Sequence, residues 1–186
     1  MIRKSLTVVA LALTLTGCGA GAAPVPTPAL LAPAAADRAP IISTPTRVDI
    51  PKLDVADEIV PVGLAPDRTM EIPPVDLVGW YDRGPLPGEP GPALLAGHVN
   101  YGGTPGTLGR IGELASGDLV HVTTQGGPVL TFVVYRVDHR PKSAFDADLI
   151  FGDRPGSELV LVTCSGRVVN HSYTDNTIVS ARLLGE

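Results

Sequence analysis

The residue with the clearest chemical potential in this sequence is Cys164. It stands at the end of an apolar run, Glu158–Thr163, in a chain that has one other cysteine. A thiol in such a place is a disulfide partner, an inert buried side chain or a reactive nucleophile. The partners that the rest of the sequence can offer decide among these three roles.

A reactive thiol needs a group that exchanges a proton, and histidine is the side chain that does this most often. His98 comes directly after the apolar segment 92–97, which we expect to be a buried strand. Loops that follow strands are where scaffolds present reactive groups, so we pair His98 with Cys164. His171 is a rival because it lies only seven residues after Cys164, although in a polar loop. The remaining histidines are expected to be ordinary strand or surface residues: His121 and His139.

The first 18 residues have the composition of an export signal. Positive charges at Arg3 and Lys4 precede an apolar stretch, residues 5–16, that is too short to span a membrane as a helix. The segment ends in Leu15-Thr16-Gly17-Cys18, which resembles the bacterial lipobox, in which the cysteine is diacylated. We therefore expect an exported protein that is lipid-anchored through Cys18 to the outer face of the bacterial cytoplasmic membrane. An ordinary cleaved signal and an uncleaved anchor are the alternatives.

Lipidation of Cys18 would limit the roles of the second cysteine. A lipidated Cys18 cannot pair with Cys164, so the exported chain would contain no internal disulfide. The remaining thiol is then either buried and inert or retained for its reactivity. A thiol at a strand end is most often a small buried hydrophobe, so a catalytic role needs support from a wider pattern.

Residues 19–45 are rich in alanine and proline and predict a tether. If they are extended as polyproline, these residues would reach about 80 Å at roughly 3.1 Å each. Four prolines interrupt any helix through the alanines: Pro24, Pro26, Pro28 and Pro33. We therefore divide the chain into a lipoprotein signal peptide (1–18), a tether (19–45) and a globular domain (46–186).

The composition predicts one mostly β domain. The chain has 186 residues, of which 44% are hydrophobic, and this is enough for one core. Its 19 prolines and 21 glycines favour short segments joined by turns over long helices. The spacing of the apolar runs suggests a barrel or a sandwich, with a short helical turn within 106–114. We expect strands near residues 47–50, 58–64, 92–97, 118–124, 129–137, 158–163 and 176–184.

Charge and ligand spacing argue against several partners. The net charge of −5 includes no basic block, so neither nucleic acid nor an anionic membrane surface is favoured as an electrostatic partner. The histidines and cysteines lack the short spacing of zinc sites, and we predict no metal or other cofactor. Calcium binding by acidic loops is left open.

Several short motifs, spread over residues 46–184, follow one another in the order in which a known protein family has them. The most specific are Ala96-Gly-His-Val99 and the Thr163-Cys164 pair after an apolar strand. The others are Arg47-Val-Asp-Ile-Pro51, Pro61-Val-Gly-Leu64, Val78-Gly-Trp-Tyr81, Pro87-Gly-Glu-Pro-Gly-Pro92 and Tyr173-Thr-Asp-Asn176. Together they resemble the sortase family, and most closely the class F sortases of actinobacteria.

The resemblance implies an eight-stranded sortase β-barrel with short helices. It also implies that Cys164 is the nucleophile that attacks a peptide sorting signal and that His98 handles the proton. Substrates of the family carry an LPXTG-like motif that is cut between Thr and Gly, and the acyl group passes to an amine of a cell-wall precursor. The implied partners are therefore a peptide or protein with a sorting signal and that amine.

One position departs from the class F pattern. Members of the class read Tyr-Arg-Asp-Asn before the last strand, and the arginine is implied to hold the substrate and stabilise the oxyanion; Thr174 occupies its position here. Threonine has one short hydroxyl and no charge, so the loss of the arginine would lower the rate by about 10² to 10³ if nothing replaces it.

Another arginine could take this role. Arg167, three residues after Cys164, is a candidate substitute. Arg182 is expected to be structural, because it lies roughly 26 Å from Thr174 along a regular strand. The sequence does not rank Arg68, Arg83, Arg110 and Arg140.

Two functions follow from these observations, and a third is disfavoured. The first is an extracytoplasmic cysteine transpeptidase, or a hydrolase, that acts on a sorting signal. The alternative is a catalytically impaired sortase-fold lipoprotein that binds peptide without cleaving it, because Thr174 replaces the usual arginine. An L,D-transpeptidase or an unrelated cysteine hydrolase is disfavoured, since the surroundings of Cys164 lack the Ser-His-Gly-Cys pattern of the former.

Overall fold

The computed structural model describes residues 42–144 and 146–185. The predicted signal peptide (1–18), its lipidation site Cys18 and residues 19–41 of the predicted tether lie outside the described residues. Within the described part of the chain, no helix is long and apolar enough to cross a membrane.

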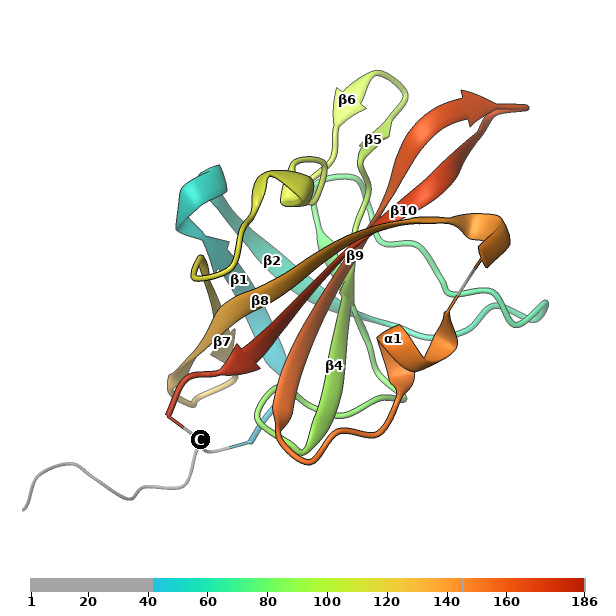
Figure 1. The fold of residues 1–186 in the computed structure, drawn as a ribbon. Coiled ribbons are helices and arrows are strands. Elements are labelled where there is room, and N and C mark those ends of the chain that lie inside the picture. Colours follow the sequence, from blue (N-terminus) through green and yellow to red (C-terminus); the bar gives the residue numbers. More distant parts are fainter. Residues whose placement is uncertain (1–41, 145, 186) are drawn as a thin grey trace, which may run out of the picture. The chain divides into compact units, whose positions relative to one another are not determined.

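Eight strands close into a barrel, in the order β1-β2-β3-β4-β9-β10-β8-β7 (Figure 1). Their bounds are Pro45–Ile50 (β1), Val55–Val62 (β2), Val78–Tyr81 (β3), Gly91–Ala96 (β4), Leu119–Thr124 (β7), Val129–Pro141 (β8), Ser157–Val169 (β9) and Ser172–Leu183 (β10). A separate two-stranded sheet consists of Asn100–Tyr101 (β5) and Thr104–Pro105 (β6). The helical segments are Pro51–Leu53 (η1), Ile111–Glu113 (η2), Lys142–Ala144 (η3) and Ala147–Phe151 (α1). The predicted mostly β fold, an eight-stranded barrel with short helices, is confirmed.

All seven strands predicted from the apolar runs are present, with ends that differ by several residues. Strand β3 was not predicted because four residues are too few to show an alternating pattern. The short elements β5, β6 and α1 were missed for the same reason. The helical turn predicted within 106–114 is the 3-10 turn η2, and the spacing of three between Leu108, Ile111 and Leu114 fits a three-residue repeat. All three side chains are buried.

Alternating apolar side chains fill the interior of the barrel. Along β7 and over residues 129–134 of β8 every second residue is buried, including Val120, Val122 and Phe132, none of which has exposed surface. The residues between them face outward, where Nδ1 of His121 lies 3.0 Å from the hydroxyl of Thr131. This is the pattern expected of a small closed barrel whose interior is packed with side chains.

Strands β4 and β9 are buried on both faces, over most of β4 and over the first half of β9. Leu95 and Leu161 belong to the core inside the barrel, whereas Leu94 and Val160 pack outside it against the buried side chains of α1. The two strands pair in parallel, and burial on both faces explains why each is a continuous apolar run and not an alternating one.

The core packing predicts a large effect of substitution at Phe132. Phe132→Ala should lower the free energy of unfolding by about 3 to 5 kcal/mol, because a fully buried ring leaves a cavity. Denaturant unfolding of the full chain measures this change. The matched control is Val129→Ala in the same strand, where the side chain is 56% exposed and a change within about 0.5 kcal/mol is expected. Equal losses in the two variants would contradict the packing described above.

Candidate active site

The parallel strands β4 and β9 bring His98 and Cys164 to the same end of the barrel. The register pairs Ala96 with Val162, and beyond it the backbone N–H of Gly97 donates to the Val162 carbonyl at 3.2 Å. The Thr163 hydroxyl then donates to the Gly97 carbonyl at 2.9 Å. The next residues along the chain are His98, just past the end of β4, and Cys164, within β9. Both line one pocket of about 140 Å³.

The imidazole of His98 is half-buried and held on two sides. Nε2 lies 3.1 Å from the backbone carbonyl of Pro73, and the ring centroid lies 5.4 Å from that of Tyr101. A carbonyl only accepts hydrogen bonds, so Nε2 carries a hydrogen and donates it. In the neutral ring this leaves Nδ1 as the nitrogen that can accept a proton.

Close packing at Gly106 fixes the backbone behind this histidine. Its N–H donates to the Val99 carbonyl at 3.0 Å. A Cβ atom at this position would overlap the carbonyl of His98, so only glycine allows the chain after β6 to approach this closely. The chain after β6 thus limits movement of the residue that carries the imidazole.

Two polar side chains that the sequence analysis did not identify lie near Cys164. Asn176 of β10 pairs directly with Cys164 of β9 and lines the same pocket. The ammonium of Lys142, from the connection between β8 and β9, lies 3.5 Å from the sulfur. The parity of the predicted last strand could have indicated Asn176, because directly opposed residues share one face of a sheet. No local pattern marks Lys142, which is 22 residues from Cys164 in sequence.

Thr174, where the class F resemblance predicts an arginine, makes a contact within the β9–β10 hairpin. The register of β10 on β9 shifts between Tyr173 and Asp175, and the Thr174 hydroxyl accepts a hydrogen bond from the backbone N–H of Arg167 at 3.1 Å. Gly166, with a φ of +79°, lies against this residue, and a Cβ atom there would collide with the side chains of Thr174 and Asp175. The hydroxyl of Thr174 therefore has a structural partner in the hairpin.

The arginines considered as substitutes for the class F arginine do not line the pocket around Cys164 in the described part of the chain. Arg167 is exposed and does not line the pocket that the described residues form around Cys164. Arg182 lies over the ring of Tyr135, with its guanidinium carbon 5.3 Å from the centroid, in a cation–π contact. Arg68 is exposed and lines the cavity described below. For the others, Arg110 pairs with Glu113, Arg140 pairs with Asp138, and Arg83 lines a separate pocket.

The other histidines do not line the pocket that the described residues form around Cys164. His171, the rival of His98, occupies the turn between β9 and β10, where it is exposed and has a φ of +62°. His139 is exposed on β8, and its Nδ1 lies 3.0 Å from the Thr177 hydroxyl. The structure therefore brings one histidine, His98, to the pocket of the thiol.

A larger apolar cavity shares walls with the pocket of Cys164. Its volume is about 690 Å³, within the range of ligand sites in proteins. The residues common to both are Met70, Ala96, Val162 and Asn176. Lys142 also lines this cavity. Its further walls come from β3, β4, α1 and the segment after β2: Leu64, Arg68, Thr69, Tyr81, Leu94, Ile150 and Phe151. The thiol is thus placed beside a space suited to apolar side chains.

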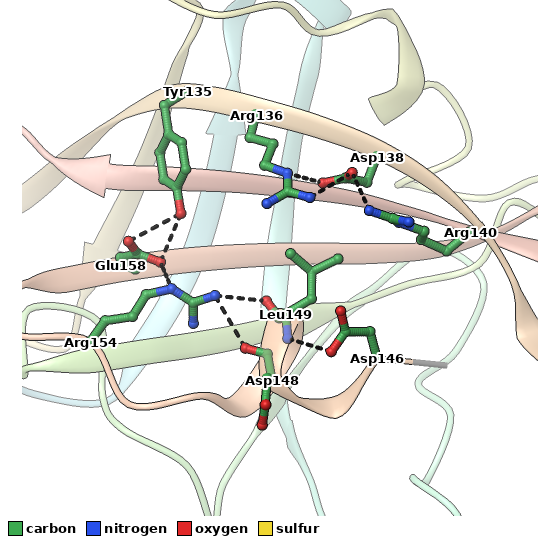
Figure 2. A network of polar contacts seen from close by, with 9 residues as sticks. All are labelled: Tyr135, Arg136, Asp138, Arg140, Asp146, Asp148, Leu149, Arg154 and Glu158. Carbon is green, nitrogen blue, oxygen red and sulfur yellow. Dashed lines mark hydrogen bonds and ion pairs between the residues drawn. The ribbon is translucent and has the colours of Figure 1, made fainter. Parts of the chain in front are cut away.

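Arg154 holds α1, which forms one wall of this cavity (Figure 2). Its guanidinium donates to the backbone carbonyls of Gly152 at 3.0 Å and of Asp148 and Leu149 at 3.2 Å. It also forms an ion pair of 2.8 Å with Glu158 of β9. A cation at the end of a helix stabilises the carbonyls of its last turn. The Asp148 carbonyl also accepts the backbone N–H of Gly152 at 3.0 Å. Arg154 therefore attaches this short helix to the strand that carries Cys164.

Glu158 extends this connection to β8. The hydroxyl of Tyr135 lies 3.1 and 3.0 Å from the two carboxylate oxygens of Glu158 (Figure 2). Burial, reinforced by the hydrogen bond to Glu158, raises the pKa of Tyr135, so the phenol keeps the proton that it donates. At the start of α1, the carboxylate of Asp146 accepts a hydrogen bond from the backbone N–H of Leu149 at 3.4 Å. These contacts fix the helix at both ends.

Arg154→Ala should loosen this wall of the cavity. Loss of charge-assisted hydrogen bonds should lower the free energy of unfolding by about 2 kcal/mol and speed amide hydrogen exchange in α1. Arg154→Lys should recover only part of the loss, because an ammonium cannot donate as a planar fork. Arg167→Ala, at an exposed arginine, is the control. Unchanged exchange in α1 after Arg154→Ala would show that the guanidinium does not hold the helix.

A comparison with known protein families matches residues 48–184 to the Sortase domain. The chain belongs to the sortase family. Similar solved structures include a Clostridium perfringens sortase D5 transpeptidase, with 23% identity and a TM-score of 0.58 over 76% of this chain and 79% of that one. Sortase C-1 from Actinomyces oris has 20% identity and a TM-score of 0.60 over 76% and 74%. Sortase A from Corynebacterium diphtheriae has 18% identity and a TM-score of 0.61 over 78% and 62%. A comparison with curated proteins finds no match.

Family membership indicates that this sortase is a cysteine transpeptidase of cell-wall proteins. The similar structures are named as sortases of different classes, and at these identities they establish the fold alone. Assignment to class F therefore stays a prediction from the sequence, as do the roles of the individual site residues.

Proposed function

We propose that this sortase is a class F enzyme that cleaves an LPXTG-like sorting signal and transfers the acyl group to an amine of a cell-wall precursor. The observation that carries the proposal is the single pocket lined by His98 and Cys164, which shares walls with an apolar cavity of about 690 Å³. A thiol and an imidazole are the two groups that acyl transfer through a thioester needs. The cavity offers a place for the apolar residues of the signal.

In the first half-reaction, the thiolate of Cys164 attacks the carbonyl carbon of the Thr residue in the Thr–Gly peptide bond of the signal. A C–S bond forms and an electron pair moves onto the carbonyl oxygen. When the carbonyl forms again, the C–N bond breaks and protonated His98 gives its proton to the departing amine. Nε2 faces the Pro73 carbonyl, so Nδ1 is the nitrogen available for this transfer. A thioester on Cys164 and a neutral imidazole remain.

In the second half-reaction, the amine of the cell-wall precursor attacks the thioester. The new C–N bond forms, the C–S bond breaks, and neutral His98 takes the proton that the amine loses. The thiolate and the protonated histidine are then restored for another cycle. Water in place of the amine would give hydrolysis and release the signal as a carboxylic acid.

The proposed location follows from the N-terminal sequence. A lipid on Cys18 would attach the enzyme to the outer face of the bacterial cytoplasmic membrane, and residues 19–45 would give the domain the reach to meet substrates. The partners proposed for this setting are proteins with a sorting signal and cell-wall precursor amines. Radiolabelled fatty acid should label the wild-type chain and not a Cys18→Ala variant; labelling of both would remove the lipoprotein assignment.

Incubation with an LPXTG-type peptide and an amine tests the proposed reaction. We expect cleavage between Thr and Gly and a thioester at Cys164, detected by mass spectrometry. Cys164→Ala should abolish both, and His98→Ala should lower kcat by about 10² to 10⁴, as expected for loss of an acid/base group. Absence of product and adduct across a set of such peptides would remove the enzyme assignment.

The alternative function is peptide binding in the same pocket and apolar cavity, without cleavage of the peptide. It is motivated by Thr174, which is uncharged and whose hydroxyl already accepts the N–H of Arg167. On this hypothesis the chain would bind the peptide without forming a thioester, and Cys164→Ala would leave the affinity unchanged. Isothermal titration with the uncleaved peptide, together with the adduct measurement, separates the two functions.

Phe151→Ala should weaken binding of the sorting signal and leave the chemical step intact. Phe151 is a wall of the apolar cavity and makes an edge-to-face contact with Tyr81, at 6.0 Å between ring centroids. We expect KM to rise about tenfold with little change in kcat, because a contact with the bound ground state is lost. Leu184→Ala, at an exposed residue after β10, is the control. A fall in kcat at constant KM would contradict this role.

A further inference from the structure

We infer that Lys142 is a catalytic residue of this sortase and supplies the positive charge that acts on Cys164 and on the oxyanion beside it. The inference rests on the proposed function of Cys164 as a nucleophile. Its starting point is the contact of 3.5 Å between the ammonium nitrogen and the sulfur. Lys142 also lines the apolar cavity that shares walls with the pocket of the thiol.

The register of three neighbouring strands explains how a residue so far away in sequence reaches the thiol. Arg140 of β8 pairs with Asn176 of β10, and Asn176 pairs with Cys164 of β9. The end of β8 therefore lies two strands from the sulfur, or about 10 Å at ordinary strand spacing. The turn η3 begins at Lys142, directly after β8, and the four-carbon stem of the lysine extends back toward Cys164.

The ammonium of Lys142 is not taken by a carboxylate. Among residues 42–144 and 146–185 it forms no ion pair, whereas Lys52 pairs with Asp118 at 2.7 Å and Arg140 pairs with Asp138 at 3.3 Å. The carboxylate of Glu71, which lines the pocket of Cys164, accepts the backbone N–H of Gly63 at 2.9 Å. The positive charge of Lys142 is thus free to act on the sulfur.

The position of Lys142 suits two charges that form in the reaction. An ammonium at hydrogen-bond distance stabilises a thiolate, which is the reactive form of cysteine. After attack, the oxyanion is one bond from the carbon that sulfur has joined, and an ammonium has three N–H donors that can serve both atoms. In this role Lys142 donates hydrogen bonds and takes no part in the proton transfers by His98.

Lys142 approaches the site from a different strand than the family arginine would. Thr174 is on β10, carries no charge and uses its hydroxyl on the backbone N–H of Arg167. Lys142 follows β8, on the other side of β10 from Cys164. A cation from β8 can therefore take over the electrostatic role while position 174 serves the hairpin.

Alkylation of Cys164 tests this inference without any sorting signal. In the full chain, with modification by iodoacetamide read on the Cys164 peptide by mass spectrometry, Lys142→Met should react about tenfold more slowly than wild type at pH 7. The effect is modest because Lys142 is exposed and water screens part of the attraction. Lys142→Arg should stay within about threefold of wild type, since it keeps the charge. Arg167→Met removes a nearby exposed charge and should leave the rate unchanged.

Turnover of the peptide gives the second measurement. Lys142→Met should lower kcat by about 10² to 10³ with little change in KM, as expected for loss of an oxyanion donor. Thr174→Arg added to Lys142→Met should restore part of kcat, which a purely structural lysine would not allow. If wild type does not cleave the peptide, the proposed function fails and the alkylation rates alone decide the role of Lys142. An unchanged alkylation rate in Lys142→Met, an unchanged kcat where wild type is active, or an equal loss in Arg167→Met would overturn the inference.

Discussion

The parallel pairing of β4 with β9 is the constraint on which the whole site depends. Its hydrogen bonds continue past the last paired row, because the Gly97 N–H donates to Val162 and the Thr163 hydroxyl donates back to Gly97. A shift of one residue in this register would turn one of the two reactive side chains, His98 or Cys164, to the opposite face. Parallel pairs occur where both faces are covered, and the barrel core and α1 supply that cover. Burial of apolar surface thus sets the geometry of a polar site.

The connection between β8 and β9 contributes both to the apolar cavity and to the surroundings of the thiol. Arg154 attaches α1 to Glu158 at the start of β9, and the same connection begins with Lys142, whose ammonium contacts the sulfur of Cys164 midway along β9. One segment therefore supplies a wall of the apolar cavity and a charge beside the thiol of Cys164.

Local sequence patterns were sufficient to find the residues that end long apolar runs. His98 and Cys164 follow continuous apolar runs, which are typical of strands buried on both faces, and the order of the family motifs strengthened this local signal. Strand β3 and helix α1 were missed because each is too short to show a period, and tertiary contacts stabilise them. His171 was a rival because it is close in sequence, yet the hairpin turn places it outside the pocket of the thiol. Proximity along the chain is a poor guide here, because His171 is at the tip of the hairpin whereas Cys164 lies along one of its strands.

The sequence by itself determined the class of fold, the apolar runs that precede a thiol and an imidazole, and the absence of an arginine at position 174. It did not determine that β9 continues past Cys164 to Val169. These depend on residue type, order and short-range pattern, which the chain carries without folding. Only the tertiary structure decided that His98 and Cys164 share a pocket, that an apolar cavity adjoins it, and that Lys142 contacts the sulfur. These depend on the register between strands far apart in sequence, and that register is set by packing of the whole barrel.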